Sequence, residues 1–103
     1  MSTQQTPVKI EARSNPSLRP HARLRHDTAR DRWVILAPER IFEPDAIAVA
    51  VLRLCDGTRS VEDIAVELGR IYDADHAQIL GDIIPTLQDL ADKHVVWIKS
   101  PDA

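Results

Sequence analysis

The feature that most constrains the fold is a pair of strand-like segments separated by a proline within residues 32–44. Trp33–Ala37 is a nearly continuous apolar run with aromatic and β-branched members, which is typical of a strand covered on both faces. Glu39–Glu43 is short, lies between Pro38 and Pro44, and carries a charge at each end. Prolines and terminal charges are typical of an edge strand. An edge strand is either protected or used for pairing, and we interpret this one as used.

The segment before this pair predicts one more strand. Ala22–His26 alternates small or apolar residues with basic ones, which indicates a strand with one solvated face. The polar residues 27–31 have hairpin length, so we expect an antiparallel sheet whose three strands are 22–26, 32–37 and 39–42. Residues 1–17 are polar and show no periodicity, and we predict a disordered tail or linker there. The expected domain spans 18–99, and 100–103 are expected to be a disordered C-terminus.

Everything after Pro44 predicts helices, each preceded by a residue that favours the N-cap position. The expected helices are 46–54 after Asp45, 61–71 after Ser60 and 76–93 after Asp75. The third has an apolar face wider than one neighbour requires, and Pro85 inside it is expected to bend it. The segment 95–98 is compatible with a fourth short strand or with an apolar cover over the core. The fold class predicted is α+β and winged-helix-like: a three-stranded antiparallel sheet followed by a three-helix bundle.

Composition excludes several classes of protein. A chain of 103 residues is one domain. No apolar run reaches the roughly 18 residues that a membrane-spanning helix needs, and the single Cys55 fits the cytoplasm. The glycines are isolated and the four histidines have no partner at metal-ligand spacing, so no phosphate loop or zinc site is expected. We predict no catalysis, no metal and no cofactor.

Charge is divided unevenly along the chain. Residues 1–44 carry eight Lys/Arg against five Asp/Glu, and residues 45–103 carry five against eleven. This asymmetry is either chance or a sign that the strand half attracts an acidic partner. The alternative function is a winged-helix DNA-binding regulator. The predicted second and third helices are acidic, which opposes binding to nucleic acid.

Two motifs carry a family resemblance. The run WVILAPER at 33–40, followed by CDGTRSV at 55–61 and LQDL at 87–90, resembles the PqqD family of pyrroloquinoline quinone (PQQ) biosynthesis over about residues 16–98. The resemblance implies a non-enzymatic chaperone that binds the precursor peptide PqqA and presents it to the radical S-adenosylmethionine enzyme PqqE. It also implies that the peptide adds as a strand to the sheet edge and lies against the last helix. Some members are fused to PqqC, which suits a linker at 1–17.

Carried over to this sequence, the resemblance proposes a peptide-binding site with two sides. The strand side comprises Pro38, Glu39, Arg40, Ile41 and Phe42, and the helix side comprises Ile79, Ile83 and Leu87. For each single helix residue the alternative of a plain core position is favoured over a peptide contact, and Arg40 either pairs with an acidic peptide side chain or is a solvated charge. The acidic helical half is a candidate surface for PqqE.

Overall fold

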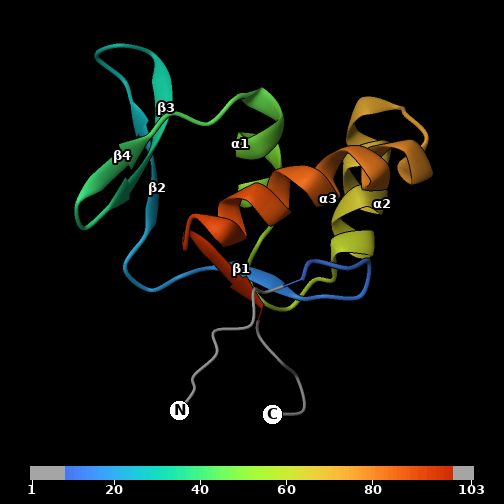
Figure 1. Ribbon diagram of the computed structural model, residues 1–103. Coiled ribbons are helices and arrows are strands. Elements are labelled where there is room, and N and C mark those ends of the chain that lie inside the picture. Colours follow the sequence, from blue (N-terminus) through green and yellow to red (C-terminus); the bar gives the residue numbers. More distant parts are fainter. Residues whose placement is uncertain (1–8, 99–103) are drawn as a thin grey trace, which may run out of the picture.

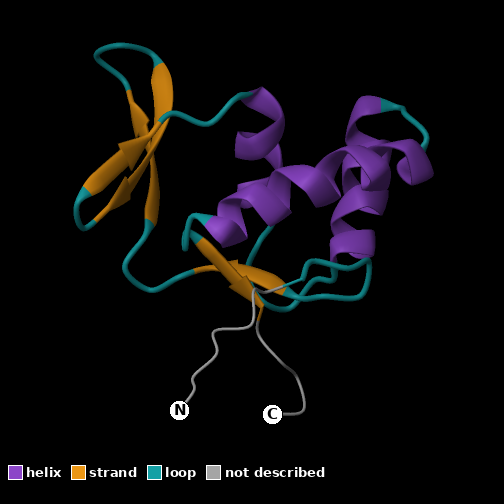
Figure 2. Cartoon of the chain, viewed as in Figure 1, coloured by secondary structure: helices purple, strands orange, loops and turns teal. Residues whose placement is uncertain are grey.

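The computed structural model describes residues 9–98, which form five strands and three helices (Figures 1 and 2). In chain order these are β1 (Pro16–Leu18), β2 (Arg23–Asp27), β3 (Arg32–Ala37), β4 (Arg40–Phe42), α1 (Ala46–Leu52), α2 (Val61–Tyr72), α3 (His76–Asp92) and β5 (Val96–Ile98). No helix in this part of the chain is both long and apolar enough to cross a membrane.

The predicted three-stranded antiparallel sheet is confirmed. Its strand order is β2-β3-β4, so β3 is the inner strand and β4 lies at an edge. The turn between β3 and β4 consists of two residues, Pro38 and Glu39, and Ala37 lies opposite Arg40. Strand boundaries differ from the predicted ones by a single residue. The sheet stands beside the helices, and the segment after β4 leads into α1 (Figure 1).

The three predicted N-caps are confirmed. The Asp45 carboxylate accepts a hydrogen bond from the Ala48 N–H at 2.8 Å, and the Asp75 carboxylate accepts one from Ala77. Ser60 and Asp63 form a reciprocal capping box at the start of α2. Such caps satisfy N–H groups that have no partner inside the helix. α1 ends at Leu52, two residues before the predicted end.

The prediction of a disordered segment through residue 17 is wrong for residues 9–17. β1 pairs with β5 in a second, two-stranded antiparallel sheet, and Ile10 is only 3% exposed in the core. The carbonyls of Ser14 and Ala12 accept hydrogen bonds from Val61 and Glu62, at the first turn of α2. These partners are distant in sequence, so no local periodicity marks the segment. Residues 1–8 and 99–103, which include the predicted C-terminal tail, lie outside the described residues.

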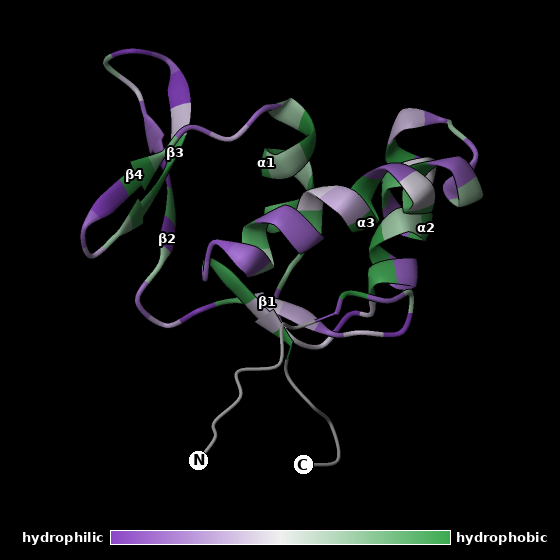
Figure 3. Cartoon of the chain, in the orientation of Figure 1, coloured by the Kyte–Doolittle hydropathy of each residue, from purple (hydrophilic) through white to green (hydrophobic). Residues whose placement is uncertain are grey.

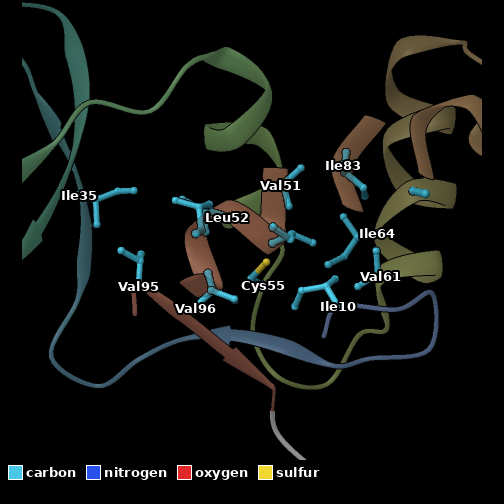
Figure 4. Close-up of a cluster of buried hydrophobic side chains, with 14 of the residues drawn as sticks. Ile10, Ile35, Val51, Leu52, Cys55, Val61, Ile64, Ile83, Val95 and Val96 are labelled. Carbon is cyan, nitrogen blue, oxygen red and sulfur yellow. The ribbon is translucent and has the colours of Figure 1, made fainter. Parts of the chain in front are cut away.

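The core joins both sheets to the helices (Figure 4). Ile35 of β3 is completely buried and points toward the helical side, where Figure 4 labels Leu52 of α1 and Val95. For segment 95–98 the sequence allowed either a short strand or an apolar cover over the core. The structure combines the two, since 96–98 form β5 and both Val95 and Val96 are buried. Ile35 anchors the three-stranded sheet, and this anchoring sets β4 beside the C-terminal half of α3.

Candidate functional site

The outer edge of β4 has no neighbouring strand within residues 9–98. Ala37 and Arg40 flank a two-residue turn, so they form the hydrogen-bonded pair of the hairpin. Antiparallel ladders alternate between bonded and non-bonded pairs, so Ile41, opposite Leu36, directs its N–H and C=O away from β3. The backbone of Ile41 is therefore available to another extended chain.

Successive side chains of β4 lie on opposite faces of the sheet. Phe42 lies opposite Ile35, is partly buried, and packs against the core. Ile41 is 70% exposed and lies opposite Leu36 on the other face. The expected strand-side residues are thus divided: Phe42 faces the helices, and Ile41 offers its backbone to the edge while its side chain points away.

A groove lies between the end of β4 and the C-terminal half of α3, with a volume of about 540 Å³. Its apolar lining comes from Ile35, Phe42, Ala48 and Leu90. Its polar lining, together with prolines, comes from Glu43, Pro44, Asp45, Pro85, Thr86, Asp89 and Lys93. An open edge beside a groove is the geometry by which sheets bind extended peptides, because main-chain bonds give affinity and side-chain pockets give specificity.

Two cations border the aromatic floor of this groove. The Arg40 guanidinium lies 4.9 Å from the centroid of the Phe42 ring, and the Lys93 ammonium lies 6.0 Å from the same ring. Lys93 is already paired with Asp89 at 2.9 Å, whereas Arg40 has no carboxylate partner among the described residues. Arg40 is therefore the available positive charge at the groove.

The predicted helix-side residues do not line this groove. Ile83 is 1% exposed and Leu87 is completely buried, so both belong to the core. Ile79 and Ile83 border a different apolar hollow of about 290 Å³, which lies among α1, α2 and α3. The groove wall is instead built from Pro85, Thr86, Asp89 and Leu90 on the adjoining face of α3 and from its C-cap residue Lys93. The sequence analysis did not name these residues as candidates. One signal in the sequence could have identified this face. Residues three or four positions apart lie on the same side of a helix, and this spacing relates Thr86, Asp89 or Leu90, and Lys93.

Pro38 and Glu39 lie in the exposed turn that precedes the edge. They are outside the groove lining, and their contribution is to form the hairpin that exposes β4. Pro38 suits this position because its fixed φ favours a turn and it has no N–H to leave unpaired.

The CDGTR motif has a structural role. The Asp56 carboxylate accepts hydrogen bonds from the Thr58 N–H at 2.9 Å and the Thr58 hydroxyl at 2.8 Å. These bonds lower the pKa of Asp56, because they favour its charged form. Gly57 adopts a positive φ of 84° and donates its N–H to the Pro16 carbonyl, which ties β1 to this loop.

Cys55 is buried beside this loop, and burial raises the pKa of its thiol to about 12. The negative charge of Asp56 acts in the same direction. A thiol with so high a pKa is a poor nucleophile at neutral pH, because the thiolate is the reactive form. Within residues 9–98 no group of three or more His, Cys, Asp or Glu side chains is arranged to hold a metal ion.

Comparison with known proteins identifies the family. Residues 32–96 match the family model described as Coenzyme PQQ synthesis protein D (PqqD). The chain belongs to the PqqD family. It is 54% identical over 86 residues to the "PqqA binding protein" of Rhodopseudomonas palustris strain BisB5, covering 84% of each chain.

Two solved PqqD structures are similar to this chain. One is the solution structure of the PqqD truncation of Methylobacterium extorquens PqqCD, described as a functional, stand-alone recognition element for ribosomally synthesised and post-translationally modified peptides. It has a TM-score of 0.78 at 47% identity, covering 88% of this chain and 97% of that one. The crystal structure of PqqD from Xanthomonas campestris has a TM-score of 0.52 at 46% identity, covering 82% and 93%.

These similarities confirm the predicted resemblance to PqqD and the α+β fold with a three-stranded antiparallel sheet and three helices. The region matched by the PqqD model runs from β3 to the start of β5. Both walls of the groove therefore lie inside the part of the chain that defines the family.

Proposed function

We propose that this PqqD chain binds the precursor peptide PqqA by adding a peptide strand to the open edge of β4, and that it presents the peptide to PqqE without catalysing a reaction. The observation that carries the proposal is the backbone of Ile41, which has no neighbouring strand on its outer side within residues 9–98 and lies beside the groove between β4 and α3. The names of the relatives, "PqqA binding protein", supply the identity of the peptide.

The groove suits a bound strand whose alternate side chains differ in character. A side chain on the inward face of such a strand meets Phe42 and Leu90, which favour an apolar group. Arg40 lies next to this position and favours an acidic group, because it has no carboxylate partner within the described residues. We therefore expect PqqA to place an apolar residue in the groove and an acidic residue close to it.

The other parts of the proposal concern the partner proteins and the cellular compartment. The radical enzyme PqqE is the expected recipient of the peptide, and association with PqqC is supported by the fused PqqCD of M. extorquens from which the solved PqqD domain is taken. A non-catalytic role is supported by the inert, buried thiol of Cys55. The same single thiol fits action in the cytoplasm.

The proposal is tested by titrating ¹⁵N-labelled protein with synthetic PqqA and following the backbone amides. We expect the largest shifts at Ile41 and Phe42 of β4 and at Thr86 and Asp89 of α3. Shifts confined to α1 and α2, or no saturable shifts at all, would contradict the proposal. Retention on duplex DNA at low salt would instead favour the DNA-binding alternative.

A further inference from the structure

The face of the three-stranded sheet that points away from the helices has its own character. The register places Arg23, Leu36 and Ile41 in one cross-strand row and Arg25 opposite Val34 in the next. We call this surface, with the adjoining hairpin residue Arg30, the outer sheet face. It borders a shallow hollow of about 480 Å³.

The centre of the outer sheet face is aliphatic. Val34 is 9% exposed, Leu36 is half-buried, and Ile41 is the most exposed large apolar side chain among the described residues. The arrangement agrees with the colouring in Figure 3, where green strand segments are bordered by purple turns. Contiguous apolar side chains surrounded by charges are a mark of protein interaction surfaces.

The charges around this centre are mostly positive and unneutralised. Arg23, Arg25 and Arg30 are exposed and have no carboxylate partner within residues 9–98. Arg32 is neutralised, because its guanidinium lies 3.3 Å from Glu43 and 3.8 Å from Asp27. Asp31 at the hairpin tip lies 3.3 Å from His26.

Arginines and lysines elsewhere give a useful contrast. Arg59, Arg70 and Lys93 each contact a carboxylate three or four residues away. Within residues 9–98 the three arginines of the outer sheet face have no such partner and lie together around one aliphatic centre, so their charges remain available to an acidic group of another molecule.

We propose that the outer sheet face docks a second protein through an acidic surface with an aliphatic centre, and that this protein is the enzyme that modifies the carried peptide. The enzyme's identity rests on the proposed peptide-binding function. A peptide strand paired with β4 extends the same sheet, so its outward side chains continue the row of Leu36 and Ile41. A protein docked there contacts the carrier and its peptide together.

The chemistry favours a protein over a nucleic acid. Leu36 and Ile41 offer apolar contact that a phosphate backbone does not use, and Asp27 places a carboxylate at the border of the face. In protein complexes, charges at the rim raise the association rate and its salt dependence, while the desolvated centre supplies most of the affinity. Docking should therefore weaken with added salt without being abolished.

The test measures two affinities for each of three proteins: wild type, Arg25→Glu, and the matched control Arg13→Glu. Arg13 is also exposed and has no ion-pair partner among the described residues, so both variants make the same change in net charge. Binding of PqqA and of PqqE to the PqqA-loaded chain is measured by calorimetry at 50 and 300 mM salt, after circular dichroism confirms the fold.

We expect Arg25→Glu to raise the Kd for PqqE at least tenfold and to reduce its salt dependence. The Kd for PqqA should stay within twofold, because Arg25 lies two strands from the β4 edge. For Arg13→Glu, the Kd for PqqA and the Kd for PqqE should both stay within twofold of the wild-type values. Equal PqqE affinity for wild type and Arg25→Glu, or an equal loss in both variants, would overturn the docking proposal.

Other outcomes are also decisive. Wild type that binds PqqA but not PqqE overturns docking and leaves peptide binding intact. Amide shifts at Arg25, Val34 and Leu36 on adding PqqE, in a chain that fails to bind PqqA, support the docking face and overturn the peptide function.

Two further results would assign the face to another occupant. A sedimentation mass of two chains for wild type that falls to one chain for Arg25→Glu would assign the face to a second copy. Duplex DNA retention lost in Arg25→Glu would assign it to nucleic acid, and both results overturn the proposal.

Discussion

The ammonium of Lys93, the C-cap residue of α3, lies 6.0 Å from the centroid of the Phe42 ring of β4, across the groove between these elements. The two residues are 51 positions apart in the chain, and their contact joins the helix wall to the open sheet edge. The same ring lies 4.9 Å from the Arg40 guanidinium, so its face is bordered by two cations. Phe42 is therefore the residue on which both sides of the groove depend.

Phe42→Ala should weaken PqqA binding at least tenfold, because the groove loses its aromatic floor. It should also lower the free energy of unfolding by about 1–2 kcal/mol, less than the 3–5 kcal/mol typical of a fully buried phenylalanine, since Phe42 is only partly buried. Calorimetric titration and urea unfolding measure the two effects. Phe42→Leu serves as the control that keeps an apolar floor, and it should retain most of the affinity. An equal loss of PqqA affinity in Phe42→Ala and Phe42→Leu would show that binding needs the aromatic ring itself and not only an apolar side chain.

Ile41→Pro should abolish detectable PqqA binding while leaving the protein folded. Proline removes the N–H that Ile41 directs away from β3, and the ladder bonds of Arg40 and Phe42 remain. Ile41→Val is the matched control: it keeps the N–H and shortens a side chain that points to the outer sheet face. It should bind within twofold of wild type. If Ile41→Pro is folded by circular dichroism and still binds PqqA, the peptide does not pair with β4.

Arg40→Gln should reduce PqqA affinity by up to about fivefold, which corresponds to the 0.2–1 kcal/mol of an exposed ion pair. The loss should be larger at low salt, because screening weakens the pair in the wild type. Titrations at 25 and 300 mM salt check this. PqqA whose acidic residues are replaced by their amides should bind wild type and Arg40→Gln equally; a persistent difference between the two proteins would show that Arg40 acts through Phe42 alone.

Ile10→Ala should lower the free energy of unfolding by about 2–3 kcal/mol, at the low end for a buried large-to-small change, because Ile10 lies in an irregular segment outside the helices and strands. Ile10 is 3% exposed, and its N–H donates to the Gln88 side chain at 2.9 Å. Lys9→Ala changes an exposed neighbour and should cost less than about 0.5 kcal/mol. Chemical unfolding of both variants tests whether this segment belongs to the cooperative fold.

What the sequence predicts well here is local chemistry. Pro38 and Pro44 mark the edge strand, and Asp45, Ser60 and Asp75 mark helix starts, because each acts through backbone groups within a few residues. The groove wall is not local. Ile83 and Leu87 match the periodicity of any apolar helix face, and the pattern does not say which part of that face meets α1 and α2 and which part meets β4.

The N-terminal error has the same origin. Ile10 and Pro16 are isolated apolar residues in a polar segment, and their burial depends on α2, α3 and β5. The pairing of β1 with β5 joins residues about 80 positions apart, and such a contact leaves no periodic trace in either segment. Nonlocal contacts therefore explain both differences from the sequence analysis: the ordered segment 9–17, and the helix-side residues that lie outside the groove.

Cys55 should react slowly with iodoacetamide at pH 8 and should make stability depend on pH under alkaline conditions. Its pKa is raised from an ordinary value of 9.0 to about 12 in the folded protein by burial and by Asp56. Between these two values the unfolded chain loses the thiol proton and the folded chain keeps it. The stabilisation is therefore complete below pH 9 and is lost as pH rises toward 12.

At pH 10 this thiol should lower the free energy of unfolding by about 1.4 kcal/mol relative to neutral pH. That amount is expected because pH 10 lies one unit above the ordinary pKa of 9.0 and still below the folded pKa. The measurement is urea unfolding of wild type and Cys55→Ala at pH 7.5 and 10, because the alanine variant carries every other titrating group. Cys55→Ala should be less stable than wild type at pH 7.5, and the difference should narrow at pH 10. A difference that stays constant between the two pH values, or rapid alkylation of the folded protein at pH 8, would show that the thiol is accessible and ionises normally.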